Sequence, residues 1–164
     1  SINFIDGVDG LAISIVCLFL ISFEFFSNSS TSLFYLSLII IFSILPLFYF
    51  NLKKEKKVFL GDSGSLFLGT FISIYVLKIL SQDYIIKFEY DMNKILFVLS
   101  VLIYPIVDIV RIIILRLKEK KSPFEADKKH IHHLILKWSK SHYVTTSIIT
   151  ISSFLFMVSM HLIF

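Results

Sequence analysis

Three short segments of the chain combine acidic, amide, glycine and histidine residues at close spacing. They are NFIDGVDG at 3–10 (the acidic segment), GDSGS at 61–65 (the GDSGS segment) and HIHH at 130–133 (the histidine segment). Asp and Asn oxygens bind hard cations, glycine-rich helix starts bind phosphate, and histidine binds metals or anions. Together these residue types indicate a site for a phosphate-bearing ligand that carries a metal ion.

In the acidic segment, Asn3, Asp6 and Asp9 recur every third residue, which would place them on one face of a helix. Their oxygens suit Mg²⁺ or the donor groups of a nucleotide base or sugar. Gly7 and Gly10 allow close approach of a ligand or of another backbone. The alternative is a polar turn that caps the helix after it, because Asn and Asp are common N-cap residues.

The GDSGS segment is a glycine-rich loop followed at once by an apolar run. Backbone N–H groups at such a helix start can receive a phosphate, and Asp62 can bind the Mg²⁺ that the phosphate carries. The segment is not a P-loop, because the Gly-Lys-Ser/Thr ending is absent. Capping of the helix by Asp62, Ser63 or Ser65 is the alternative, and it is the stronger explanation for this segment taken alone.

The histidine segment follows two lysines, Lys128 and Lys129. Their positive potential favours a polyanion such as a pyrophosphate. His130 and His133 would share a helical face, but no nearby cysteine completes a zinc pattern and the zinc-protease motif H-E-x-x-H is absent. A solvated basic loop at the membrane surface remains the alternative.

Long apolar runs must hold these segments in place. The chain of 164 residues is 56% hydrophobic and only 17% charged, whereas soluble domains carry about 25% charged residues. A helix needs about 20 apolar residues to cross a membrane. We therefore expect a single all-α polytopic membrane domain with about five spans. The runs that predict them are 11–26, 32–50, 65–80, 95–117 and 145–164.

The run at 95–117 contains three residues that are unusual in a membrane span. Pro105 can kink the helix. Asp108 and Arg111 are ionisable, and such residues in a span usually face the bundle interior or water. At i and i+3 they can form a structural ion pair, and direct contact with a ligand is an equal alternative.

The distribution of cations predicts the orientation. Segments 51–64 and 116–144 hold twelve Lys and Arg residues, against two in 27–31 and 81–94. By the positive-inside rule the first two are cytoplasmic, and residues 1–10 then also lie inside. All three chemically specialised segments fall on this face, which predicts one shared cytoplasmic site.

Four stretches, NFIDGVDGLA, FLGDSGSLFLG, PIVDIVR and SPFEADKKHIHH, occur in an order that resembles the polyprenyl-phosphate N-acetylhexosamine-1-phosphate transferases, glycosyltransferase family 4. The HIHH form is nearer to the undecaprenyl-phosphate N-acetylglucosamine branch than to the phospho-N-acetylmuramoyl-pentapeptide branch. The resemblance implies transfer of a sugar-1-phosphate, such as GlcNAc-1-phosphate, from a UDP-N-acetylhexosamine to undecaprenyl phosphate, with release of UMP. It implies the bacterial inner membrane, Mg²⁺ or Mn²⁺, no nucleic acid, and the start of envelope polysaccharide synthesis, such as O-antigen of lipopolysaccharide.

The resemblance also implies roles for single residues. Asp62 is the expected magnesium ligand, with Asn3 near the metal, and Phe59 would stack on the uracil with Asp9 nearby. The histidines would close on the substrate phosphates. The expected catalytic residues are Asp62, Asp6, Asp9, His130, His132 and His133. The expected substrate-binding residues are Asn3, Phe59, Gly61, Ser63, Lys128 and Lys129.

One departure limits the resemblance. The family pattern has about twice as many spans and an Asp-Asp motif in its N-terminal half, whereas no two acidic residues are adjacent in this chain. We therefore expect the C-terminal half of a transferase, inactive without the missing N-terminal half or a partner chain. Two alternatives are a non-catalytic membrane module that binds nucleotide sugar or lipid phosphate or pairs with another subunit, and a small transporter with Asp108 and Arg111 on its ion path.

Overall fold

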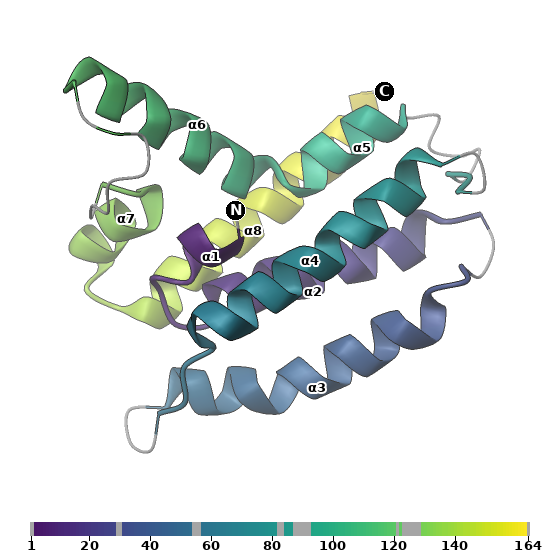
Figure 1. The fold of residues 1–164 in the computed structure, drawn as a ribbon, viewed down its shortest axis with the longest axis horizontal. Coiled ribbons are helices and arrows are strands. Elements are labelled where there is room, and N and C mark those ends of the chain that lie inside the picture. Colours follow the sequence, from purple (N-terminus) through teal and green to yellow (C-terminus); the bar gives the residue numbers. More distant parts are fainter. Residues whose placement is uncertain are drawn as a thin grey trace.

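A computed structural model gives the fold (Figure 1). It describes residues 2–28, 31–53, 57–81, 84–86, 93–120, 122 and 129–163. Within these ranges the regular elements are helices, apart from an isolated antiparallel bridge between Ser27 and Ile86. The helices are α1 (Ile2–Ile5), α2 (Leu11–Phe26), α3 (Phe34–Leu52), α4 (Gly61–Leu80), α5 (Lys94–Val101), α6 (Ile103–Lys118), α7 (Ile131–Ser139) and α8 (His142–Ile163).

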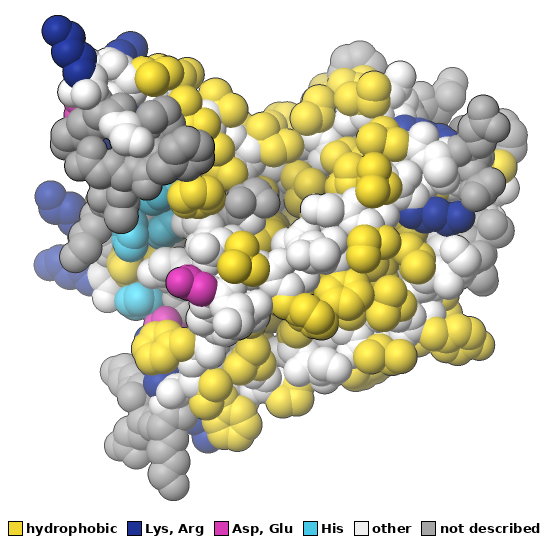
Figure 2. All heavy atoms as spheres, viewed as in Figure 1, with side chains coloured by type: hydrophobic (Ala, Val, Ile, Leu, Met, Phe, Trp, Pro, Cys, Tyr) yellow, Lys and Arg dark blue, Asp and Glu magenta, His cyan; other side chains and the backbone are white. Residues whose placement is uncertain are grey.

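Three of these helices, α3, α4 and α8, are long and apolar enough to cross a membrane, and α5 with α6 can form a fourth, broken span. Large apolar side chains cover much of their outer surface, including Tyr35, Phe67 and Leu155. Figure 2 shows this apolar cover over one face of the bundle. An all-α polytopic membrane protein is therefore confirmed.

The helix α2 lies at the centre of the bundle and packs against α3, α4 and α8 (Figure 1). It has 16 residues, fewer than the about 20 that usually cross the hydrocarbon layer. Three of its four aromatic residues are buried, and two of them, Phe19 and Phe23, pack edge-on against Tyr75 of α4. The predicted run at 11–26 is thus a helix held mainly by protein neighbours.

The predicted run at 95–117 is not one straight helix, because α5 and α6 meet at an angle of 74° around Leu102. Pro105 explains the break. It has no N–H to donate to the carbonyl of Val101, and its ring clashes with that carbonyl in a continuous helix. As the third residue of α6, Pro105 is tolerated where a helix start leaves N–H groups unpaired anyway.

The connections gather in two groups at opposite ends of the bundle (Figure 1). One end holds α1, α7, the end of α3, and the starts of α2, α4 and α8. All three chemically specialised segments therefore lie at that end.

Candidate functional site

The acidic segment touches both of the other segments. On one side, Ser65 Oγ donates a hydrogen bond to Asn3 Oδ1 at 2.7 Å. On the other, a Cβ added at Gly7 would lie 2.7 Å from His132 Nε2 and 3.3 Å from the ring of His133. Histidine and acidic side chains show next to each other at this end of the molecule in Figure 2. The structure thus brings the three segments together.

The acidic segment is not one continuous helix, so the expectation that its three polar residues share a helical face is wrong. The helix α1 ends at Ile5, and a turn carries Asp6 and Asp9 to the start of α2. Burial, together with the nearby carboxylates of Asp62 and Asp9, raises the pKa of Asp6 to about 6. The turn therefore concentrates negative charge that a cation would relieve.

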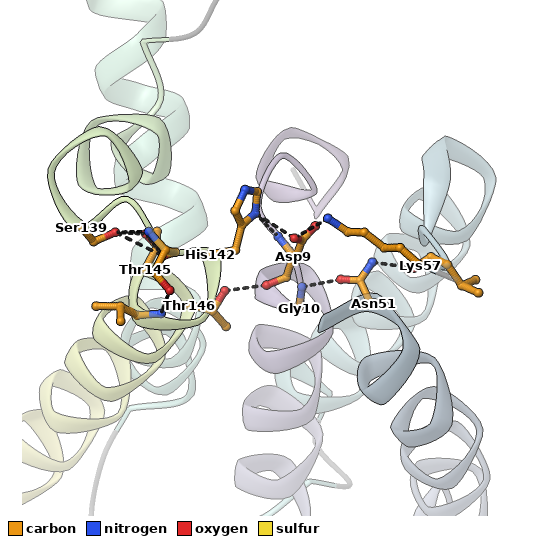
Figure 3. A network of polar contacts seen from close by, with 11 residues as sticks. Asp9, Gly10, Asn51, Lys57, Ser139, His142, Thr145 and Thr146 are labelled. Atoms are coloured by element: carbon orange, nitrogen blue, oxygen red, sulfur yellow. Dashed lines mark hydrogen bonds and ion pairs between the residues drawn. The ribbon is translucent and has the colours of Figure 1, made fainter. Parts of the chain in front are cut away.

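Asp9 has two basic partners, which Figure 3 shows. Its Oδ2 lies 2.5 Å from Lys57 Nζ and 3.0 Å from His142 Nδ1. The backbone beside it is held as well: Thr146 Oγ1 donates to the Asp9 carbonyl at 2.7 Å, and Gly10 N–H donates to Asn51 Oδ1 at 2.5 Å. These contacts tie the acidic segment to α3 and α8, so it does not serve as a simple helix cap.

Sequence reasoning gave His142 no role. The contact between His142 and Asp9 joins residues 133 positions apart. No local pattern signals a contact of that kind, because it depends on how α8 packs beside α2. The same is true of Thr146, one turn further along α8.

The helix α4 begins at Gly61, whose φ of 69° lies in the left-handed region that favours glycine. Among the residues that the structure describes, no side chain caps this helix, so the capping alternative is wrong; Ser65 instead donates to Asn3. Asp62 and Ser63 are exposed in the first turn. The start of α4 therefore presents open N–H groups beside a carboxylate.

Phe59 lies just before α4 and is 68% exposed. The Nζ of Lys57 lies 4.9 Å from the centroid of the Phe59 ring. Lys57 thus links the ring to Asp9, which its ammonium group also contacts.

The histidine segment is packed tightly against the acidic segment. His130 and His132 are buried and their rings stack at 5.2 Å, while Phe4 stacks on His130 at 6.1 Å. Burial and the neighbouring His133 lower the pKa of His132 to about 4. His132 is therefore neutral near pH 7, so it would contact a phosphate as a hydrogen-bond donor and not as a cation.

The helix α6 holds the histidine segment from behind. Asp108 Oδ2 lies 2.6 Å from His130 Nδ1, and Arg111 donates to the Lys129 carbonyl at 2.6 Å. Tyr104 OH lies 3.0 Å from His132 Nδ1. Asp108 and Arg111 thus bind the histidine segment instead of pairing with each other, and Tyr104 is a further contact that sequence reasoning missed.

Two groups of residues are candidates for binding a metal ion. Among the described residues, ligand atoms of Asp108, His130 and His132 lie within 4.8 Å of one another, but each residue already has a hydrogen-bond partner. Asn3 Oδ1 accepts one hydrogen bond and keeps a second lone pair, and Asp62 is exposed. The hard oxygens of Asn3 and Asp62 therefore fit Mg²⁺ better in kind.

The two lysines expected to bind substrate have different outcomes. Lys128 lies outside the described residues. Lys129 forms an ion pair with Glu119 at the end of α6. The side chain of Lys129 is 44% exposed, so this pair is a weak one that solvent screens.

Fold and site together define a multi-pass helical membrane protein with one polar, partly acidic site at one end of its bundle. Comparison with known proteins then gives the family: the model described as Glycosyl transferase family 4 matches residues 1–80, which include the acidic and GDSGS segments. With the relatives below, this match shows that the chain belongs to glycosyl transferase family 4.

Named relatives agree with this assignment. The chain is 35% identical over 161 residues to the "Probable undecaprenyl-phosphate N-acetylglucosaminyl 1-phosphate transferase" of Bacillus subtilis (strain 168), covering 97% of this chain and 43% of the relative. It is 33% identical over 142 residues to the "Undecaprenyl-phosphate alpha-N-acetylglucosaminyl 1-phosphate transferase" of Escherichia coli (strain K12), covering 84% and 37%. The chain spans less than half the length of these relatives. No solved structure matches it significantly.

Proposed function

We propose that this chain forms the nucleotide-sugar-binding part of an enzyme that transfers N-acetylhexosamine-1-phosphate, with GlcNAc as the favoured sugar, from a UDP-sugar to undecaprenyl phosphate. The convergence of the three segments carries the proposal, through the Ser65–Asn3 hydrogen bond and the contact of Gly7 with His132. The names of the relatives support the acceptor and the sugar. In this proposal the site lies on the cytoplasmic side of a bacterial inner membrane, which agrees with the excess of Lys and Arg in segments 51–64 and 116–144.

The reaction forms a bond from an acceptor phosphate oxygen to the β-phosphorus of the UDP-sugar. It breaks the bond from that phosphorus to the bridging oxygen, and UMP leaves with the electron pair. Catalysis of such transfers consists mainly of positioning and charge neutralisation.

Each segment has a part in this scheme. Phe59 offers an exposed ring for stacking on uracil, and the open start of α4 offers N–H groups to a phosphate. The histidine segment lies across the acidic turn from the GDSGS segment, where it can bind the same pyrophosphate. Asp62 and Asn3 would hold Mg²⁺ or Mn²⁺, which neutralises phosphate charge when bound.

A second candidate function is a membrane module that binds nucleotide sugar without completing transfer. It is favoured by the share of the relatives that the chain spans, 43% and 37%. Both candidates require the same nucleotide-sugar site, and they differ in whether UMP is released.

A binding experiment tests the shared part of both. The chain in lipid nanodiscs is titrated calorimetrically with UDP-GlcNAc, with and without Mg²⁺. We expect Mg²⁺ to strengthen the binding of UDP-GlcNAc. We expect Asp62→Asn to reduce this Mg²⁺-dependent increase in affinity by about tenfold or more. Glu24→Gln is the matched control, because Glu24 bonds Ser37 and Thr31 outside the candidate site. Mg²⁺-dependent binding that is unchanged in Asp62→Asn would remove the metal assignment.

A further inference from the structure

We propose that α6 is a positioning arm for the histidine segment and that its Asp108 decides which nitrogen of His130 carries a proton. The proposal rests on the proposed function, because it assumes that His130 contacts the nucleotide sugar. Asp108 and Arg111 are positioning residues in this scheme, because they act on the ligand only through the histidine segment and the residue before it.

Three residues on one stripe of α6 contact the histidine segment and the residue before it. Tyr104, Asp108 and Arg111 stand at i, i+4 and i+7, so they follow one another along a single helix face. They bind successive parts of the next element in reverse order: His132 Nδ1 at 3.0 Å, His130 Nδ1 at 2.6 Å and the Lys129 carbonyl at 2.6 Å. A periodic match of this kind fixes both the register and the rotation of the histidine segment.

Asp108 is 0% exposed, and both of its oxygens are in use. Oδ1 accepts from the backbone N–H of Ile131, the first residue of α7, at 2.7 Å, and Oδ2 faces His130 Nδ1. A buried carboxylate is costly unless hydrogen bonds satisfy it. In the proposed arrangement the Asp108 carboxylate accepts both hydrogen bonds, so His130 Nδ1 donates to it and Nε2 is the nitrogen available to a ligand.

The ring of the neighbouring His132 has the same orientation relative to α6 as the ring of His130. Its Nδ1 faces Tyr104 of α6, while its Nε2 faces Gly7 of the acidic segment. The ring of His132 therefore lies between α6 and the acidic segment. Phe4 of the acidic segment stacks on His130 and limits its rotation.

The bend between α5 and α6 gives the arm its angle. Because α6 turns 74° away from α5, its polar stripe reaches the histidine segment at the site end of the bundle. The carboxylate of Asp108 on α6 thus lies beside the histidine segment.

The variant Asp108→Asn tests the inference with almost no change of shape. Asparagine has one oxygen and one NH₂, and the Ile131 N–H needs the oxygen. The NH₂ must then face His130 Nδ1, which has to give up its proton. We expect the ¹⁵N NMR signal of His130 Nδ1 in histidine-labelled protein to move from a protonated to an unprotonated position.

The same samples report on binding. We expect Asp108→Asn to weaken UDP-GlcNAc binding by about 10-fold or more, by analogy with the about 10- to 100-fold losses seen when partners that orient metal-binding histidines are removed. Glu24→Gln, a matched loss of a carboxylate elsewhere in the bundle, should change neither the His130 signal nor the affinity. Wild-type binding that persists unchanged in Asp108→Asn, or a His130 Nδ1 signal that is already unprotonated in the wild type, would overturn the proposal.

Failure of the proposed function is seen separately. If wild-type protein shows the protonated Nδ1 signal but binds no UDP-GlcNAc, the proposed function fails and the Asp108–His130 contact stands.

If Asp108→Asn does not fold, Tyr104→Phe tests the arm by deleting one hydroxyl. Its expected results are a change in the His132 signal and a loss of about two- to tenfold in affinity, and no change in either would count against the arm.

Discussion

Gly7 is the residue at which the acidic segment meets the rings of His132 and His133. Its lack of a side chain is needed because a Cβ would lie 2.7 Å from His132 Nε2, closer than carbon and nitrogen approach without a bond. The sequence indicated close approach at this glycine, since glycine admits a neighbouring group, but not what would approach it.

We predict that Gly7→Ala displaces the histidine segment. Overpacking of this kind costs about 1–3 kcal/mol, so the free energy of unfolding in detergent should fall by that amount, and UDP-GlcNAc binding should weaken. Gly69→Ala is the matched control, because its Cβ would lie 3.7 Å from Ile2 Cβ, an ordinary contact. Equal stability of the two variants would show that the contact at Gly7 is looser than described.

Asp6 and His132 give the stability of the fold opposite dependences on pH. The pKa of Asp6 is raised from 3.8 to about 6, so the folded chain keeps a proton that the unfolded chain releases, and this contribution falls as pH rises through that window. The pKa of His132 is lowered from 6.5 to about 4, so the unfolded chain binds the extra proton, and this contribution falls as pH drops. In the wild type the two slopes oppose each other.

Replacing either residue should expose the pH dependence of stability that the other residue contributes. Asp6→Asn is expected to make stability rise more steeply with pH between about 4 and 6.5 than in the wild type. His132→Asn is expected to turn the slope downward between about 4 and 6. The measurement is the midpoint of thermal unfolding in detergent across this range. If the unfolding midpoints of both variants follow the same pH dependence as the wild type, the shifted pKa values of Asp6 and His132 are contradicted.

At the scale of elements, the bend between α5 and α6 depends on Pro105. The sequence predicted a kink there from the missing N–H, but neither its angle of 74° nor its consequence for the histidine segment. Those depend on α8, against which α5 packs, and on α7, which α6 holds.

We predict that Pro105→Ala straightens this pair of helices, because residue 105 can then donate to the Val101 carbonyl. Spin labels at the exposed positions Ile95 and Leu117, in a chain without Cys17, should move further apart. Electron spin resonance distance measurement checks this.

The control is Pro46→Ala, since Pro46 lies within α3, which continues unbroken from Phe34 to Leu52. It should leave the distance between the labels unchanged. An unchanged distance in Pro105→Ala would mean that packing alone holds the bend.

At the scale of the whole molecule, the chain is shorter than the relatives that it matches. The chain spans 43% of the Bacillus subtilis relative, and it contains no adjacent pair of acidic residues of the kind the family resemblance places in the other half. In the proposed function the described segments bind the nucleotide sugar, whereas activation of the lipid phosphate has no assigned residue.

We predict that residues 1–164 alone bind UDP-GlcNAc but release no UMP in the presence of undecaprenyl phosphate. Joining them to the part of the Bacillus subtilis relative that they do not cover should restore release, measured by coupled detection of UMP. Asp62→Asn in that joined protein serves as the control for chemistry at this site. Robust transfer by residues 1–164 without a partner would contradict the prediction.

The sequence by itself determined the all-helical membrane fold and the candidate site segments. Apolar runs long enough to cross a bilayer must be helical, because backbone groups in lipid have no other partners nearby. The order of four stretches, which include the three segments and PIVDIVR, carried the family resemblance that the family match and the relatives confirmed. These properties are local or cumulative along the chain, so no knowledge of packing is needed to see them.

Only the tertiary structure decided how the residues are paired. Asp9 binds Lys57 and His142, and Asp108 binds His130, through contacts that span 22 to 133 positions of the chain. The expectation of one helical face for the acidic segment failed because α1 ends at Ile5, before the chain turns into α2. Such pairings depend on the angles and registers at which helices pack, and hydrophobic periodicity does not encode them residue by residue.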